Sequence, residues 1–141
     1  MVLSIDNDEA ITLPEALLER ICAEHTDKEV ELVIVDAKSM HALNLEHRNV
    51  DKTTDVLSFP IDDFPHAPLG SIVINYELAF QKAAELGHEK EEEIALLFIH
   101  GLLHLLGFDH ETDHGEMRKN EEELIFRYAL PKSLIVRTEE V

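Results

Sequence analysis

Three histidines in one short segment have the spacing of metal ligands. His100 and His104 are four residues apart, so on a helix their imidazoles project from the same face. Gly107 permits the left-handed backbone conformation that ends a helix, and the returning chain can then bring in His110. Three neutral ligands leave one coordination position open, which is typical of catalytic zinc, whereas structural zinc usually has four protein ligands. The spacing therefore predicts one Zn²⁺ ion, or another transition metal, held by His100, His104 and His110.

Two other interpretations of these histidines stay open. Histidines in a leucine-rich helix are commonly packing residues whose ring nitrogens bond to backbone or carboxylate oxygens. His114 follows His110 by four residues and could be a fourth ligand, although its polar surroundings favour a solvated side chain. The third histidine and the glycine fall where a metal site needs them, which favours the metal over packing alone.

The residue after the first histidine distinguishes classes of zinc enzyme. In zinc peptidases with this histidine spacing it is a glutamate that acts as general base. Here it is Gly101, so the sequence disfavours a peptidase. A zinc hydrolase of another substrate, including a peptidase with a displaced base, is the alternative to the function that follows.

Segment 100–110, with the sequence HGLLHLLGFDH, resembles a motif of the YbeY family of bacterial metal-dependent endoribonucleases. Segments 48–60 and 69–74 resemble the other two motifs of that family. The resemblance implies a single-strand endoribonuclease that acts in ribosomal RNA maturation and ribosome quality control, with a metal-bound water attacking the phosphodiester. It also implies catalytic roles for Arg48 and His100, and it makes the ribosome or a small-subunit ribosomal protein a candidate partner.

Two positions depart from the pattern of that family. Thr53 stands where the family usually has proline, a change expected to alter only the stiffness of a loop. Ser71 stands where the family usually has aspartate, and we assign it no role.

Arg48 is the best candidate for holding the scissile phosphate. A guanidinium offers planar, two-pronged recognition of phosphate that lysine cannot match. The alternative is a surface ion pair with Glu46 or Asp51, a common fate of an exposed arginine. Asp55, Ser58 and Asp109 are weaker candidates that could equally have structural roles.

The formal net charge of −18 opposes tight binding of a polyanion by the free chain. Dependence on a basic partner or on the ribosome would remove this difficulty, and an acidic host proteome or solubility would explain the charge equally well. A third function class is a non-enzymatic ribosome-associated protein whose metal is structural, which the open three-ligand site disfavours. We expect RNA rather than DNA as the nucleic acid.

The composition favours a cytoplasmic protein. Cys22 is the only cysteine, which excludes an internal disulfide and suits a reducing compartment. We expect no secretory signal, because no basic segment precedes an apolar one at the N-terminus. The longest apolar run falls short of the roughly 18 residues of a membrane span, so we expect no membrane partner.

Apolar runs predict strands over 2–5, 29–35, 56–59 and 71–74. Helical periodicity predicts helices over 12–23, 36–47, 75–86, 89–106 and 115–129, the fourth apolar on nearly every side and therefore central. The predicted fold is a single α+β (mixed α/β) domain over 1–141, with a small mixed four-stranded sheet packed against about five helices. The resemblance implies the same architecture, with a zincin-like metal helix beneath the sheet.

Side chains that can cap helices mark where several of these helices begin and end. Thr12 and Glu15 have the spacing of a capping box for the first helix. Asp36 or Ser39 could cap the second helix, and Asn75 is expected to cap the third.

Overall fold

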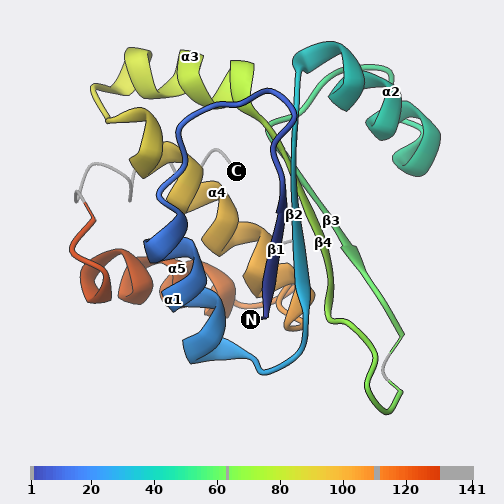
Figure 1. Cartoon of the computed structure of the whole chain (residues 1–141), viewed down its shortest axis with the longest axis vertical. Helices are drawn as coiled ribbons and strands as arrows, with labels where there is room; N and C mark the ends of the chain where they lie inside the picture. Colours follow the sequence, from blue (N-terminus) through green and yellow to red (C-terminus); the bar gives the residue numbers. More distant parts are fainter. Residues whose placement is uncertain (1, 63, 110–111, 131–141) are drawn as a thin grey trace.

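The computed structural model describes residues 2–62, 64–109 and 112–130. Within these ranges the chain forms four strands and five helices (Figure 1). In chain order they are β1 (Leu3–Asp6), α1 (Glu15–His25), β2 (Val30–Val35), α2 (Ala37–Arg48), β3 (Val56–Pro60), β4 (Gly70–Asn75), α3 (Tyr76–Leu86), α4 (Lys90–Leu105) and α5 (Glu116–Arg127). The predicted combination of four strands and five helices is confirmed.

The strands form one mixed sheet in the order β1-β2-β4-β3. The β1–β2 and β2–β4 pairs are parallel, whereas β3 runs antiparallel to β4. β3 is therefore an edge strand, and its outer edge is not covered by another strand of this sheet. Figure 1 shows α1, α4 and α5 on one side of the sheet and α2 on the other.

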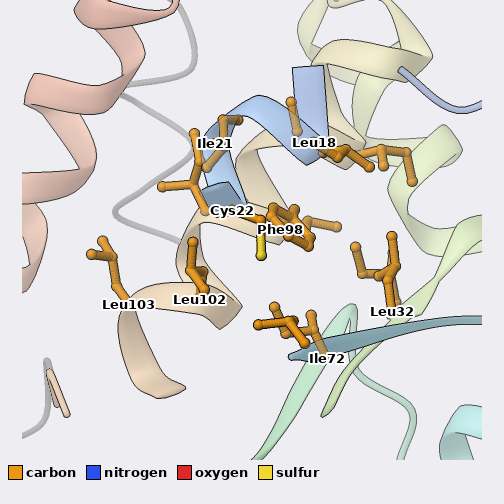
Figure 2. Close-up of a cluster of buried hydrophobic side chains, with 14 of the residues drawn as sticks. Leu18, Ile21, Cys22, Leu32, Ile72, Phe98, Leu102 and Leu103 are labelled. Carbon is orange, nitrogen blue, oxygen red and sulfur yellow. The ribbon is translucent and has the colours of Figure 1, made fainter. Parts of the chain in front are cut away.

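The two faces of the sheet carry separate apolar clusters, as the period of two along a strand requires. Ile72 and Ile74 of β4 pack into the large core on the α4 side. Between them, Val73 faces the α2 side and packs with Leu57 and Met40 in a smaller cluster. In Figure 2 the large core is seen as side chains of α1, the sheet and α4 that meet around Phe98.

α4 is the central helix, as its sequence predicts. It contacts α1, α3, α5, β3 and β4, so an apolar surface is needed on nearly all of its sides. Its side chains are buried from Glu93 to Leu103. The helix has a capping box in which the Glu89 side chain and the Glu92 side chain satisfy the first backbone N–H groups. No helix in the described part of the chain combines the length and apolar character of a membrane span.

The predicted caps are confirmed at two helices and wrong at a third. The Asp36 carboxylate accepts from the Ser39 N–H, and the Asn75 side chain accepts from the first turn of α3. At α1, however, Pro14 is the residue before the first turn and no side chain caps the helix. Proline disfavours helical backbone in the residue before it, so the helix begins after Pro14 and Thr12 lies too far upstream to cap it.

Candidate metal centre

His100 and His104 project from the same face of α4 and meet at their Nε2 atoms. These two nitrogens are 3.1 Å apart, and the ring centroids are 4.7 Å apart. His100 is buried, whereas His104 is half-buried and lies in the last turn of α4. The C-terminal end of a helix carries partial negative charge, which favours a cation bound there. The predicted convergence of the two imidazoles is confirmed.

The other ring nitrogen of each histidine is held by an oxygen acceptor. His100 Nδ1 is 2.5 Å from Oε1 of Glu121, a residue of α5. His104 Nδ1 is 3.0 Å from the carbonyl oxygen of Phe108. The turn after α4 positions that carbonyl, because Gly107 has a φ of +103° that suits glycine and reverses the chain.

These contacts decide which ring nitrogens are available to a metal. A carbonyl oxygen only accepts, so His104 Nδ1 must carry the proton and its Nε2 presents a lone pair. A carboxylate at Glu121 likewise places the proton of neutral His100 on Nδ1. The two Nε2 atoms are 3.1 Å apart, which is close enough for both to bind one cation. The pair therefore fits a transition metal, whose preferred protein ligands include neutral imidazole nitrogen.

The third predicted ligand, His110, lies outside the described residues. Across 2–62, 64–109 and 112–130, no group of three His, Cys, Asp or Glu side chains is arranged to hold a metal ion. The three-histidine site and its Zn²⁺ ion therefore stay predictions. His114, the suggested fourth ligand, is exposed.

Glu121 is the residue of this site that the sequence prediction missed. It is only 2% exposed, and it belongs to a buried stripe with Met117, Leu124 and Ile125 of α5 and with Tyr128, which directly follows that helix. The spacing of that stripe is helical, so a carboxylate in it is an ionisable group at a core position. A carboxylate at the helical spacing of an apolar stripe is the sequence signal that could have identified Glu121.

Arg48 is the last residue of α2, and α2 lies on the other side of the sheet from α4 (Figure 1). The end of α2 is held against β3 by His47, whose ring is 5.0 Å from the ring of Phe59. Among the described residues no hydrogen bond or ion pair joins Arg48 to His100 or His104. The structure thus does not bring the predicted phosphate-binding residue into contact with the predicted metal ligands.

The exposed Arg48 side chain also makes neither of the ion pairs considered as its alternative role. Asp51 instead lies 2.7 Å from Nε2 of His41. Within the described part of the chain, no interaction joins Arg48 to Glu46. The guanidinium is therefore available to a ligand from outside the chain.

Ser58 has a structural contact next to the metal centre. Its hydroxyl donates to the carbonyl oxygen of Gly101 at 3.1 Å and so ties β3 to α4. A Cβ atom on Gly101 would lie only 2.7 Å from Cγ2 of Ile72 and 3.2 Å from the Ser58 hydroxyl. Glycine at this position lets α4 approach the sheet closely, which gives a packing reason for the absence of the peptidase glutamate.

Asp55 and Asp109 are not the partners of the two described histidines at Nδ1. Those nitrogens already bond to Glu121 and to the Phe108 carbonyl. The backbone carbonyl of Asp55 accepts from Asn75, and that of Asp109 accepts from Thr112 and Asp113 in the turn before α5.

Comparison with known proteins gives a family for this arrangement. Residues 3–129 match the family model described as endoribonuclease YbeY. The chain belongs to the YbeY family. It is similar to the endoribonuclease YbeY of Nitratiruptor sp., with 60% identity over 124 residues that cover 88% of this chain and 86% of that protein. The protein of the same name from Campylobacter jejuni strain RM1221 is 63% identical over 122 residues, which are 86% of this chain and 90% of that protein.

Two further comparisons cover nearly the whole chain. The endoribonuclease YbeY of Sulfurimonas denitrificans is 50% identical over 138 residues, covering 98% of this chain and 99% of that protein. The solution structure of a Thermotoga maritima protein is similar with a TM-score of 0.57 and 25% identity, covering 93% and 94% of the two chains. The α+β architecture is therefore shared with an experimentally determined structure.

The two departures from the YbeY pattern have local hydrogen bonds in this structure. The Thr53 hydroxyl donates to the carbonyl of Ala37 at 3.0 Å and accepts from the Asn75 side chain at 3.1 Å. It thus fixes the connection between α2 and β3 by side-chain bonds that proline could not make. The Ser71 hydroxyl donates to the Glu31 carboxylate on the neighbouring strand at 2.9 Å.

Proposed function

We propose that this chain is a metal-dependent endoribonuclease that cleaves single-stranded RNA during ribosomal RNA maturation and quality control. The observation that supports this most strongly is the pair of Nε2 atoms 3.1 Å apart, each on a ring whose Nδ1 is held by an oxygen. Membership of an endoribonuclease family supplies the class of substrate.

His100, His104 and His110 would hold the metal in this proposal. A bound Zn²⁺ ion would supply Lewis-acid stabilisation of phosphoryl charge and lower the pKa of a coordinated water to about 7. The chain's own residues then have to fix the ligands and hold the RNA. Glu121 and the Phe108 carbonyl orient the histidines, and no glutamate is needed at the position of Gly101.

Arg48 would bind a phosphate of the RNA backbone. Its side chain is exposed and faces no protein partner among the described residues. Because α2, which ends at Arg48, and α4 lie on different sides of the sheet, an RNA that contacts Arg48 and the histidines would pass around the edge strand β3. A flexible single strand can follow such a path, whereas a double helix is stiff over this length. The arrangement therefore favours a single-stranded substrate.

The net charge of −18 bears on how RNA reaches the site. A strongly acidic surface slows the approach of a polyanion and weakens its binding. We infer that the RNA is presented by the ribosome or by a basic protein of the small subunit. Cleavage of free RNA should then be slow and should fall as the salt concentration is lowered, since less screening strengthens the repulsion.

The proposal is tested by incubating metal-loaded and chelated protein with single-stranded RNA, double-stranded RNA and casein in parallel. We expect internal cleavage of single-stranded RNA by the metal-loaded sample alone. Chelator-sensitive cleavage of casein without cleavage of RNA would replace the proposal with a peptidase. Absence of any cleavage, with metal bound, would favour a structural metal in a non-enzymatic protein.

A further inference from the structure

Glu121 is a buried carboxylate on a helix whose other glutamates are exposed or half-buried. It is 2% exposed, whereas Glu116 and Glu123 are exposed and Glu122 is half-buried beside Arg118. Burying a carboxylate costs free energy unless a hydrogen bond or a positive charge compensates it. An apolar side chain at this position would pack α5 against α4 without that cost, so helix packing alone does not account for Glu121.

The compensating hydrogen bond of Glu121 comes from His100, a predicted metal ligand. Oε1 of Glu121 lies 2.5 Å from Nδ1 of His100, across 21 residues of sequence and between two packed helices. The other nitrogen of the same ring is directed at Nε2 of His104. The Glu121 carboxylate therefore bonds to Nδ1 of His100, whereas Nε2 of the same ring faces the position of the predicted metal.

We propose that Glu121 is a positioning residue for the metal centre. By accepting the Nδ1–H of His100, it holds that ring in the tautomer that leaves Nε2 unprotonated, and it fixes the ring's rotation toward His104. Its negative charge also offsets part of the positive charge that a buried divalent ion brings. The proposal rests on the metal site of the proposed function, and it adds a residue of α5 that does not touch the metal.

Two substitutions separate the acceptor role from the charge. Glu121→Gln keeps a similar shape and an oxygen acceptor but removes the charge, whereas Glu121→Leu removes both and suits the buried stripe. Glu122→Gln removes the same charge from the next residue of α5 and is the matched control. All four proteins are prepared free of metal, checked for folding by circular dichroism, and titrated with Zn²⁺ in competition with a chromogenic chelator.

We expect Glu121→Leu to bind Zn²⁺ about 10- to 100-fold more weakly than the original chain, with Glu121→Gln between the two and Glu122→Gln unchanged. Nitrogen-15 spectra of the imidazoles in the metal-free proteins give a second readout. The His100 ring should carry its proton on Nδ1 in the original chain and lose that preference in Glu121→Leu. A merely structural glutamate would change stability without changing this tautomer.

Neither readout uses RNA, so the outcomes separate the two proposals. If the original chain binds no Zn²⁺, the metal site of the proposed function is wrong. If it binds Zn²⁺ and a folded Glu121→Leu or Glu121→Gln protein binds equally tightly with an unchanged tautomer, only the positioning role is overturned. Should Glu121→Leu fail to fold, the near-isosteric Glu121→Gln decides the question.

Discussion

The two sides of the sheet place functional groups in opposite physical settings. On the α4 side, the His100–Glu121 pair has side-chain exposures of only 6% and 3% and joins α4 to α5, two helices that contribute side chains to the large core. On the α2 side, Arg48 is exposed at the end of a helix that packs over a small cluster of Met40, Leu57 and Val73. Metal ligands need fixed geometry, which a packed core provides, whereas a phosphate that arrives from solvent must be met at the surface.

This difference separates the expected effects of mutation. A change on the α4 side should alter metal content, stability and activity together. The predicted metal ligands lie on α4, and α4 and α5 also pack the large core. A change at Arg48 should alter activity alone.

The largest effect is expected at a metal ligand. His104→Ala should reduce the metal content from close to one equivalent to nearly none, and RNA cleavage should fall by more than the roughly 100-fold expected for a residue that only supports a ligand. Elemental analysis and a cleavage assay on the same preparation measure both. His114→Ala removes an exposed histidine nearby and is the control. Equal metal content in the two variants would remove His104 from the site.

The second effect concerns Arg48. Arg48→Ala and Arg48→Lys should each reduce RNA cleavage on the order of 100-fold, because a point charge cannot replace a two-pronged phosphate contact. Metal content and the free energy of unfolding should stay unchanged, since the described structure gives Arg48 no protein partner. Arg118→Ala, which removes an exposed guanidinium from α5, should cleave normally. Normal cleavage by Arg48→Lys would refute the phosphate role.

The third effect concerns the close approach of α4 to the sheet. Gly101→Ala should lower the free energy of unfolding, because overpacking costs about 1–3 kcal/mol and exceeds the gain of at most ~1 kcal/mol in helix propensity. The added methyl would lie 2.7 Å from Cγ2 of Ile72. Urea denaturation of Gly101→Ala, Ile72→Ala and the double variant measures the coupling. The double variant should lose less stability than the sum of the two, and simple additivity would contradict the predicted clash.

The smallest effect concerns a contact between α1 and the end of α5 that lies outside the proposed site. The Tyr128 hydroxyl donates to the Glu24 carboxylate at 2.5 Å. Burial, and then Glu24, raises the pKa of Tyr128 from 10.0 to about 12. Because the pKa of Tyr128 is raised, the stabilisation of the fold by its neutral hydroxyl is fully present below pH 10.0. That stabilisation is lost as the pH rises toward about 12.

The stabilisation from the Tyr128–Glu24 contact also depends on pH in the acid range. The hydrogen bond from Tyr128 is the main reason that the pKa of Glu24 lies below its usual 4.5. The corresponding stabilisation is present above pH 4.5 and is lost as the pH falls through the lowered pKa. Tyr128→Phe should therefore lower Tm by a few degrees at neutral pH and by less at either extreme, with metal content unchanged. A difference in Tm that is constant with pH would contradict this reasoning.

The sequence predicted the elements well because their signals are local. The strands are short apolar runs, and Asp36 and Asn75 cap helices through atoms two or three residues away. The convergence of His100 and His104 follows from helix geometry alone. The predicted cap at Thr12 was wrong because the steric effect of the following Leu13–Pro14 pair overrides the match in spacing.

What the sequence did not predict depends on packing between distant segments. The Glu121–His100 bond joins two helices whose contact is set by the whole core, and its only local signal was a carboxylate in a buried stripe. The side of the sheet on which α2 packs depends on how the chain crosses from β2 to β3, which no local pattern specifies. Family resemblance implied catalytic roles for Arg48 and His100 but did not indicate that α2 and α4 lie on different sides of the sheet.

The most direct test of the proposed function is a titration of Zn²⁺ into metal-free protein with the rate of single-stranded RNA cleavage as the signal. We expect almost no cleavage without metal, a rise in proportion to added Zn²⁺, and a plateau at one equivalent per chain. Full cleavage by the metal-free protein, or a rate that does not respond to Zn²⁺ while the ion binds, would contradict the proposed function.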